Sequence, residues 1–189
     1  MAGVIGVDEV GRGSWAGPLL VVAAIAKGAL PDGLRDSKLL SKKRRDELFD
    51  QIKTSCQLGE GWVQPEEIDK YGLTRAMRLG VSRALIMLSA DFKDQIIIDG
   101  HINYCPKDFI NSQAVIKADD LHPIVSAASI YAKVLRDAHM SRLAQLYPAY
   151  GFDKHVGYGT HLHELMLRVH GPTRIHRRSF KPVAKLLAS

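Results

Sequence analysis

Residues 3–13, GVIGVDEVGRG, place two adjacent acids at the end of an apolar run and follow them with a glycine–arginine–glycine turn. The run 3–8 is predicted to be a buried strand, because small and β-branched residues continue up to the acids. A second apolar run, PLLVVAAIA at 18–26, follows after a short turn, so a strand at 18–27 is expected to pair antiparallel with the first. The glycines leave the backbone after the acids free to approach a ligand closely.

The rest of the chain alternates strands with helices. Strands are predicted at 56–63, 95–100 and 114–117, and helices from a cap at Ser41, at 65–68, at 73–88 and from Pro123 to about Tyr147. The tail alternates glycine turns with short helical segments. This order predicts an α/β fold, and the antiparallel opening pair makes the sheet mixed, which excludes a simple doubly wound fold.

The composition is typical of a soluble globular protein: of 189 residues, 46% are hydrophobic and 24% are charged. The longest apolar run is too short to cross a bilayer and lies behind charged residues, unlike a signal peptide, so no membrane association and a cytoplasmic location are expected. Two cysteines, Cys56 and Cys105, are predicted to pack in the fold, and nothing demands more than a monomer.

The net charge of +6 is unevenly distributed along the chain. From Lys133 to the end, ten Lys or Arg residues stand against three Asp or Glu, so the excess lies in the last third. A polyanion such as nucleic acid could dock there. A solvated surface explains the same charge equally well.

Acidic residues follow three of the predicted strands, as Asp8 with Glu9, Asp99, and Asp119 with Asp120. Isolated buried carboxylates are strongly disfavoured, so a cluster of them predicts hard divalent cations, Mg²⁺ or Mn²⁺, bound through oxygen. Two such ions could activate water and stabilise the departing oxygen in phosphodiester hydrolysis. Any one of these acids alone is more often a turn former or a helix cap, so their repeated position carries the prediction.

The glycine-rich turn GRGSWAG matches the dinucleotide-binding fingerprint only weakly. Its glycines fall at 11, 13 and 17, and an apolar strand follows where that fingerprint needs a helix. The turn is better suited to a close approach to a sugar, with Arg12 near a phosphate. The histidines predict no metal site either, because His161 and His163 would point to nearly opposite sides of a helix, and structural roles are expected for them.

A series of motifs across nearly the whole chain resembles bacterial ribonuclease HII. In order, they are DEVGRG at 8, DSK at 36, IDG at 98, KADD at 117 leading into SAASIYAK at 126, GYGT at 157, His163, GP at 171 and HRRSF at 176. The resemblance rests on their joint order and spacing. It implies a ribonuclease H-like mixed sheet flanked by helices, in a single catalytic domain over 1–189. The core would cover about 1–147, and a helical region at about 148–189 would bind substrate.

The same resemblance implies an endoribonuclease that hydrolyses RNA paired with DNA. It would also cut 5′ of a single ribonucleotide embedded in duplex DNA, leaving a 3′-hydroxyl and a 5′-phosphate. Two divalent ions would be held by Asp8, Glu9, Asp99 and Asp119. Neighbours in a strand point to opposite faces, so the first strand must twist or end for Asp8 and Glu9 both to reach metal.

The choice between Asp119 and Asp120 stays open at this point. In the family, the acid of this motif usually follows Lys-Gly, whereas Ala118 stands at the glycine position here. The spacing to SAASIYAK puts Asp119 in register.

Substrate contacts are implied at six positions. The backbone of Gly11, Arg12 and Gly13 would contact the 2′-hydroxyl, which distinguishes RNA from DNA. Tyr158 would offer its hydroxyl to the ribose and its ring to the next deoxyribose, at the RNA–DNA junction. Contacts to phosphate are implied for Lys38 and Ser37.

Two residues of the tail have more than one possible role. His176 and Arg177 could support the tyrosine or the backbone, or be purely structural.

Two other functions also stay open. A different polynucleotide nuclease or transferase of the same fold would ignore the 2′-hydroxyl. A non-catalytic nucleic-acid-binding module would not explain the clustered acids.

Overall fold

The computed structural model describes residues 3–34, 37 and 40–187. In chain order the elements are β1 (Val4–Val10), β2 (Leu19–Ala26), α1 (Lys42–Ser55), β3 (Cys56–Val63), α2 (Pro65–Tyr71), α3 (Leu73–Leu88), β4 (Gln95–Asp99), β5 (Ser112–Val115), α4 (Ala118–Leu121), α5 (Pro123–Leu146), the 3-10 turn η2 (Pro148–Tyr150), α6 (Phe152–His155), α7 (His161–His170) and α8 (Lys181–Leu187). The predicted strands and long helices are all present. Two differences matter for the site: β1 continues beyond residue 8, and β5 lies two residues earlier than predicted.

The five strands form one mixed sheet in the order β3-β2-β1-β4-β5. The first strand pairs antiparallel with β2 and parallel with β4, and β4 pairs parallel with β5. This confirms the predicted antiparallel opening pair within an α/β sheet. Because β1, β4 and β5 are parallel, their carboxyl ends meet at the same edge of the sheet.

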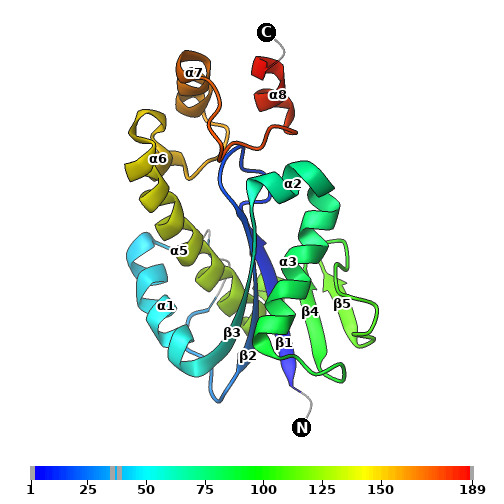
Figure 1. The fold of residues 1–189 in the computed structure, drawn as a ribbon. Helices are drawn as coiled ribbons and strands as arrows, with labels where there is room; N and C mark the ends of the chain where they lie inside the picture. The colour runs from blue at the N-terminus through cyan, green and yellow to red at the C-terminus, as the bar shows by residue number, and fades with distance from the viewer. Residues whose placement is uncertain (1–2, 35–36, 38–39, 188–189) are drawn as a thin grey trace.

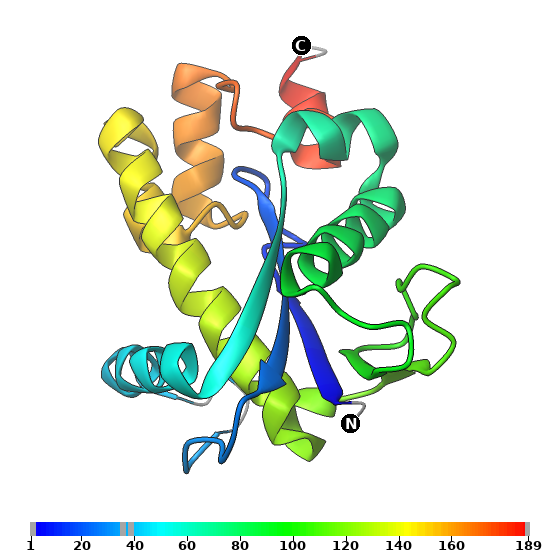
Figure 2. The same ribbon diagram turned by 60° about the horizontal axis from the view of Figure 1, so that its bottom comes forward.

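Alternate residues of the central strands face two separate hydrophobic clusters. Val7 and Val21 belong to the cluster that includes α3, whereas Leu20 and Val22 belong to the cluster that includes α1 and α5. The ribbon shows the same three layers, with α3 covering one face of the sheet and α1 with α5 covering the other (Figures 1 and 2). The sequence of β2 is apolar along its whole length because both faces of this strand are covered.

Helix α5 lies directly against β1 at Gly6. A β-carbon at this position would come within 2.6 Å of the main chain of Ile124 and Val125, so only glycine allows the contact. This close approach brings the next turns of α5 alongside the acidic end of β1. Ser129 consequently lies next to Asp8, with which it shares a hydrogen bond.

The C-terminal segments form a third, smaller core with the end of α5. Its buried members are Ala16, Met140, Tyr150, Phe152, Leu167 and Val183. Figure 1 shows α7 and α8 beyond the upper end of the sheet, on the side where β1 ends. The tail therefore packs against the turn that follows β1.

Two further sequence predictions can be compared with the described residues. Both cysteines are free thiols, Cys56 buried and Cys105 half-buried, as expected of packed residues. Among the described residues, none of the helices has the length and apolar character needed to span a membrane.

Candidate active site

A cleft of about 460 Å³ lies at the carboxyl end of β1 and contains most of the predicted site residues. It is lined by Asp8, Glu9, Val10, Gly11, Arg12, Gly13, Ser37, Asp99, Ser129, Lys133 and Tyr158. The fold thus brings three of the four predicted metal-binding acids together with the glycine-rich turn, Ser37 and Tyr158. Lys38, the remaining predicted substrate contact, lies outside the described residues.

Asp8 and Glu9 border the same cleft although they are neighbours in a strand. The strand does not end at these residues, because β1 stays paired with β2 through Val10. Its pairing with β4, however, stops at Val7. The β4 side of β1 is therefore open beside the two acids, and side chains from both faces of the strand can border the cleft at that edge.

Burial and mutual repulsion raise the pKa of both acids. The pKa of Asp8 is raised well above its usual value, mainly because burial penalises the charged carboxylate, and further because Glu9 and Asp99 carry the same charge. Burial also raises the pKa of Glu9, against the opposing charge of Arg12 and with a further rise from Asp99. The guanidinium of Arg12 lies 3.6 Å from the Glu9 carboxylate. A divalent cation bound by these three carboxylates would stabilise their negative charges in the partly desolvated cleft.

Asp99 and Asp119 are linked through the start of α4. The Asp99 carboxylate accepts a hydrogen bond from the Ala118 amide at 2.7 Å, which ties α4 to the end of β4. Asp119 does not follow a strand directly, as the sequence had suggested, but lies within α4. It is 7% exposed, whereas Asp120 is exposed to solvent, so Asp119 is the inward member of the pair. Asp119 is not among the residues that line the cleft.

The chemistry of these side chains fits a hard divalent cation. Asp8, Glu9 and Asp99 supply only oxygen ligands, which Mg²⁺ and Mn²⁺ prefer. Among the described residues, no group of three His, Cys, Asp or Glu side chains is preassembled to hold an ion. Binding by several of the acids therefore requires their carboxylates to turn toward the ion.

Helix α5 contributes side chains to the cleft that sequence reasoning missed. Ser129 hydrogen bonds to the Asp8 carboxylate, and its hydroxyl lies 3.1 Å from that of Ser37. Lys133 lines the cleft one turn later. Residues 129, 133 and 136 recur at helical spacing and share one face of α5. That spacing is visible from the motif SAASIYAK onward and is the signal that could have found them.

Tyr104 is a second contact without a sequence prediction. Arg12 donates a hydrogen bond to its hydroxyl at 3.4 Å, and the guanidinium lies 6.0 Å from the centre of the ring. Tyr104 belongs to the long connection between β4 and β5, where no periodicity marks which side chains turn inward. Arg12 is therefore flanked by Glu9 and Tyr104 at the edge of the cleft.

Two completely buried arginines, Arg136 from α5 and Arg177 from the tail, hold the turn of residues 11–17. Their guanidinium groups donate to the main-chain oxygens of Arg12, Ala16, Gly17, Pro18 and Val156, and to the hydroxyl of Ser14. A guanidinium can satisfy several acceptors at once from one rigid plane. The two arginines thus hold the turn from both sides. Arg177 therefore has a structural role, which was one of the possibilities that the sequence left open.

Tyr158 borders the cleft from the tail. Its ring lies 5.7 Å from the guanidinium carbon of Arg136, and the residue is 36% exposed. The preceding Gly157, at a φ of 87°, has a carbonyl that accepts the amides of Trp15 and Ala16. The loop that carries Tyr158 is therefore bonded directly to the turn after β1.

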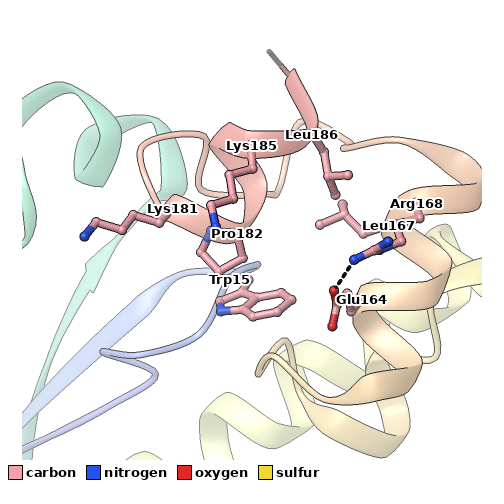
Figure 3. Close-up of a pocket in the computed structure, with 8 residues that line it drawn as sticks. All are labelled: Trp15, Glu164, Leu167, Arg168, Lys181, Pro182, Lys185 and Leu186. Atoms are coloured by element: carbon pink, nitrogen blue, oxygen red, sulfur yellow. Dashed lines mark hydrogen bonds and ion pairs between the residues drawn. The ribbon is translucent and has the colours of Figure 1, made fainter. Parts of the chain in front are cut away.

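A second cavity, of about 340 Å³, lies between α7 and α8 and is lined by Trp15, Glu164, Leu167, Arg168, Lys181, Pro182, Lys185 and Leu186. Figure 3 shows the Trp15 indole next to Pro182 of α8, with the ion pair between Glu164 and Arg168 across from it. Trp15 packs against the third core. Three basic side chains border this cavity.

Known proteins share both the sequence and the fold. A family model for ribonuclease HII matches residues 5–183. Ribonuclease HII of Erythrobacter litoralis is 45% identical over 189 residues, covering 96% of this chain and 89% of that protein. Ribonuclease HII of a Marinomonas species is 45% identical over 185 residues, covering 96% and 92%. The crystal structure of ribonuclease H2 from Pyrococcus horikoshii superposes with a TM-score of 0.77 at 29% identity, over 97% of this chain and 96% of that one.

Fold and site together define a ribonuclease H-like nuclease with an acidic cleft at the end of its central strand. The chain belongs to the ribonuclease HII family. It is a metal-dependent hydrolase, a ribonuclease H of type 2, and the family acts as endonucleases on the RNA of RNA–DNA hybrids. The predicted fold class and family resemblance are confirmed, and membership excludes a non-catalytic binding module.

Proposed function

We propose that this enzyme, besides acting on RNA–DNA hybrids, cuts duplex DNA on the 5′ side of a single embedded ribonucleotide. The products would be a 3′-hydroxyl and a 5′-phosphate on the ribonucleotide. The observation that carries this proposal is that three of the four acids, the glycine-rich turn and Tyr158 line one cleft. A ribose bound there would meet the reacting groups and the groups that recognise it at the same place.

The main chain of Gly11, Arg12 and Gly13 is assigned to the 2′-hydroxyl. Support comes from the position of this turn directly after the acids and from open space at Gly13, where a β-carbon would meet nothing within 4 Å. Main-chain groups held by two buried arginines are preorganised hydrogen-bonding partners. Tyr158 is assigned to the junction, where its hydroxyl would contact the ribose and its ring the next deoxyribose.

Asp8, Glu9, Asp99 and Asp119 are assigned to two divalent ions, Mg²⁺ or Mn²⁺. When bound, such ions supply charge stabilisation at the phosphate and make water a stronger nucleophile. The protein's own part is to orient the ligands: Ser129 hydrogen bonds to Asp8, and the Ala118 amide donates to Asp99.

Binding of the nucleic-acid backbone is assigned to two regions. Ser37 and Lys38 would contact a phosphate near the cleft, and support for Ser37 is its place in the cleft wall. Residues of about 148–189 would bind substrate as part of one catalytic domain, an assignment supported by the basic side chains around the second cavity. We expect the enzyme to act as a monomer in the cytoplasm.

A single cleavage assay tests the proposal. An end-labelled DNA duplex with one ribonucleotide is incubated with Mg²⁺, with Mn²⁺ or with chelator, and the cut is mapped to the nucleotide. We expect a metal-dependent cut on the 5′ side of the ribonucleotide, and none when that sugar is 2′-deoxy. Cleavage of the all-DNA duplex would instead identify a nuclease that ignores the 2′-hydroxyl.

A further inference from the structure

A chain of hydrogen bonds runs through two buried histidines to the main chain of Tyr158. Nδ1 of His163 lies 3.0 Å from the Tyr158 carbonyl oxygen, and Nε2 of His163 lies 3.1 Å from Nε2 of His176. At the far end, the Thr173 amide donates to Nδ1 of His176 at 2.9 Å. The exposed fractions of the two histidines are 0% and 1%, so this chain is shielded from water.

The protons in this chain can be placed from either end. The Tyr158 carbonyl only accepts, so Nδ1 of His163 carries a proton and its Nε2 accepts. The Thr173 amide only donates, so Nδ1 of His176 accepts and its Nε2 carries the proton. Both assignments make Nε2 of His176 the donor and Nε2 of His163 the acceptor in the hydrogen bond between the rings. Two neutral imidazoles therefore use all four of their nitrogens, and burial lowers the pKa of each to about 4.

Neighbouring contacts restrict the same loop further. His155 stacks on His163 with ring centres 4.5 Å apart, and its carbonyl accepts the Tyr158 amide at 2.9 Å. The Tyr158 carbonyl also accepts the Thr160 amide at 2.9 Å. The main chain of Tyr158 is thus bonded at both its donor and its acceptor, while its ring extends to the cleft.

We propose that His163 and His176 are positioning residues for Tyr158, holding it by its main-chain carbonyl so that its ring faces the acidic cleft. This inference rests on the proposed role of Tyr158 at the RNA–DNA junction. Neither histidine lines the cleft, so both act through the tyrosine and not on the reacting atoms. They should therefore affect the choice between substrates more than the rate of hydrolysis itself.

Substitutions at His163 separate positioning from packing. His163→Leu removes both hydrogen bonds, whereas His163→Asn keeps a donor near the position of Nδ1. We expect His163→Leu to lower kcat/KM for a single embedded ribonucleotide, relative to a continuous RNA–DNA hybrid, by about tenfold. His163→Asn should restore most of that preference. The control is Gln51→Leu, at an exposed position on α1 outside the cleft, which should change kcat/KM for neither substrate.

A double-mutant cycle with Tyr158→Ala decides between the two roles. If His163 acts through the tyrosine, His163→Leu has no further effect on preference in the Tyr158→Ala background. An equal loss in both backgrounds would overturn the positioning role while leaving the junction role of Tyr158 intact. If Tyr158→Ala itself leaves the preference unchanged, the proposed role of the tyrosine fails, and the inference fails with it.

The wild-type enzyme offers a test that does not depend on variants folding. Nitrogen-15 NMR of the imidazole rings distinguishes protonated from unprotonated nitrogens. At neutral pH we expect the proton of His163 on Nδ1 and that of His176 on Nε2. The opposite tautomer at either ring would contradict the hydrogen-bond chain and overturn the proposal.

Discussion

The guanidinium of Arg136 lies 5.7 Å from the centre of the Tyr158 ring and donates to the Pro18 carbonyl at 2.9 Å, so one buried side chain joins the tyrosine to the glycine-rich turn. The two parts that are proposed to recognise the sugar therefore share a support. A change at this support should affect stability and substrate recognition together.

Arg136→Lys tests that shared support. Lysine keeps the charge but cannot donate from one plane to several carbonyls, so some buried acceptors would lose their partners. We expect the free energy of unfolding to fall by about 2–3 kcal/mol, measured by urea denaturation. We also expect lower kcat/KM on the single-ribonucleotide duplex. Arg142→Lys, at an exposed position on the same helix, is the control. A loss no larger than that of the control would contradict the role of Arg136.

Asp8→Asn should abolish most turnover while preserving the fold. The pKa of Asp8 is raised in the folded protein, so in the absence of metal its ionisation costs stability as pH rises through the interval between its usual and its raised pKa. We therefore expect the metal-free variant to be at least as stable as the wild type at pH 8, and to gain less Tm from added Mn²⁺. The measurements are turnover and thermal unfolding with and without the ion.

The neighbouring acids of α4 supply a matched pair for that experiment. Asp119→Asn should lose activity as Asp8→Asn does, whereas Asp120→Asn, at an exposed position, should retain it. The reverse outcome would move the assignment to Asp120.

The buried histidines should make the protein sensitive to mild acid. Their pKa values are about 4 in the folded protein and about 6.5 in the unfolded chain, so the unfolded chain binds more protons between those values. The free energy of unfolding that the two neutral histidines contribute is therefore fully present above about pH 6.5 and falls toward pH 4, by about 1.4 kcal/mol per histidine for each pH unit. In urea unfolding with chelator present, His176→Gln should reduce this pH dependence. The control His161→Asn should leave the pH dependence unchanged. If the free energy of unfolding varied with pH in the same way for the wild type and for His176→Gln, the predicted linkage would be contradicted.

Lys181 and Lys185 should contribute to binding through charge alone. Each phosphate contact that is lost lowers the dependence of log K on log salt by about 1. We expect the double variant Lys181→Ala, Lys185→Ala to bind a catalytically inert duplex more weakly and with a shallower salt dependence. The same charge change at Lys42 and Lys43, on the exposed side of α1, is the control. Identical slopes of log K against log salt for both double variants would show that Lys181 and Lys185 do not contact the duplex.

Much of the architecture was predictable because local patterns and tertiary structure agree. Ile5 through Asp8 are buried in a strand, as predicted, whereas Val4 at the start of that strand is exposed, and the antiparallel partner follows from the short turn. The acids could be expected at one edge because parallel strands end together. What local patterns could not show is that the pairing of β1 with β4 stops at Val7, which leaves the edge of β1 open beyond that residue.

Contacts between distant segments account for the rest. Asp119 was expected at a strand end, but Lys117 adopts a φ of 56° and the Asp99 carboxylate caps the following amide, so a short helix forms. His163 and His176 meet only because the tail folds back on itself, and no spacing rule links them. Ser129 was within reach of helical periodicity, although nothing in the sequence marks Asp8 as its partner.

Anomalous diffraction from crystals soaked in Mn²⁺ shows whether the four acids bind metal. We expect Mn²⁺ peaks in the cleft within coordination distance of the carboxylates of Asp8, Glu9, Asp99 and Asp119, with the side chains turned toward the ions. Their absence from the Asp8→Asn variant would assign them to this site. Peaks elsewhere, or a cleft that stays empty at saturating Mn²⁺ while the acids remain apart, would contradict the assignment of these acids to the metal ions.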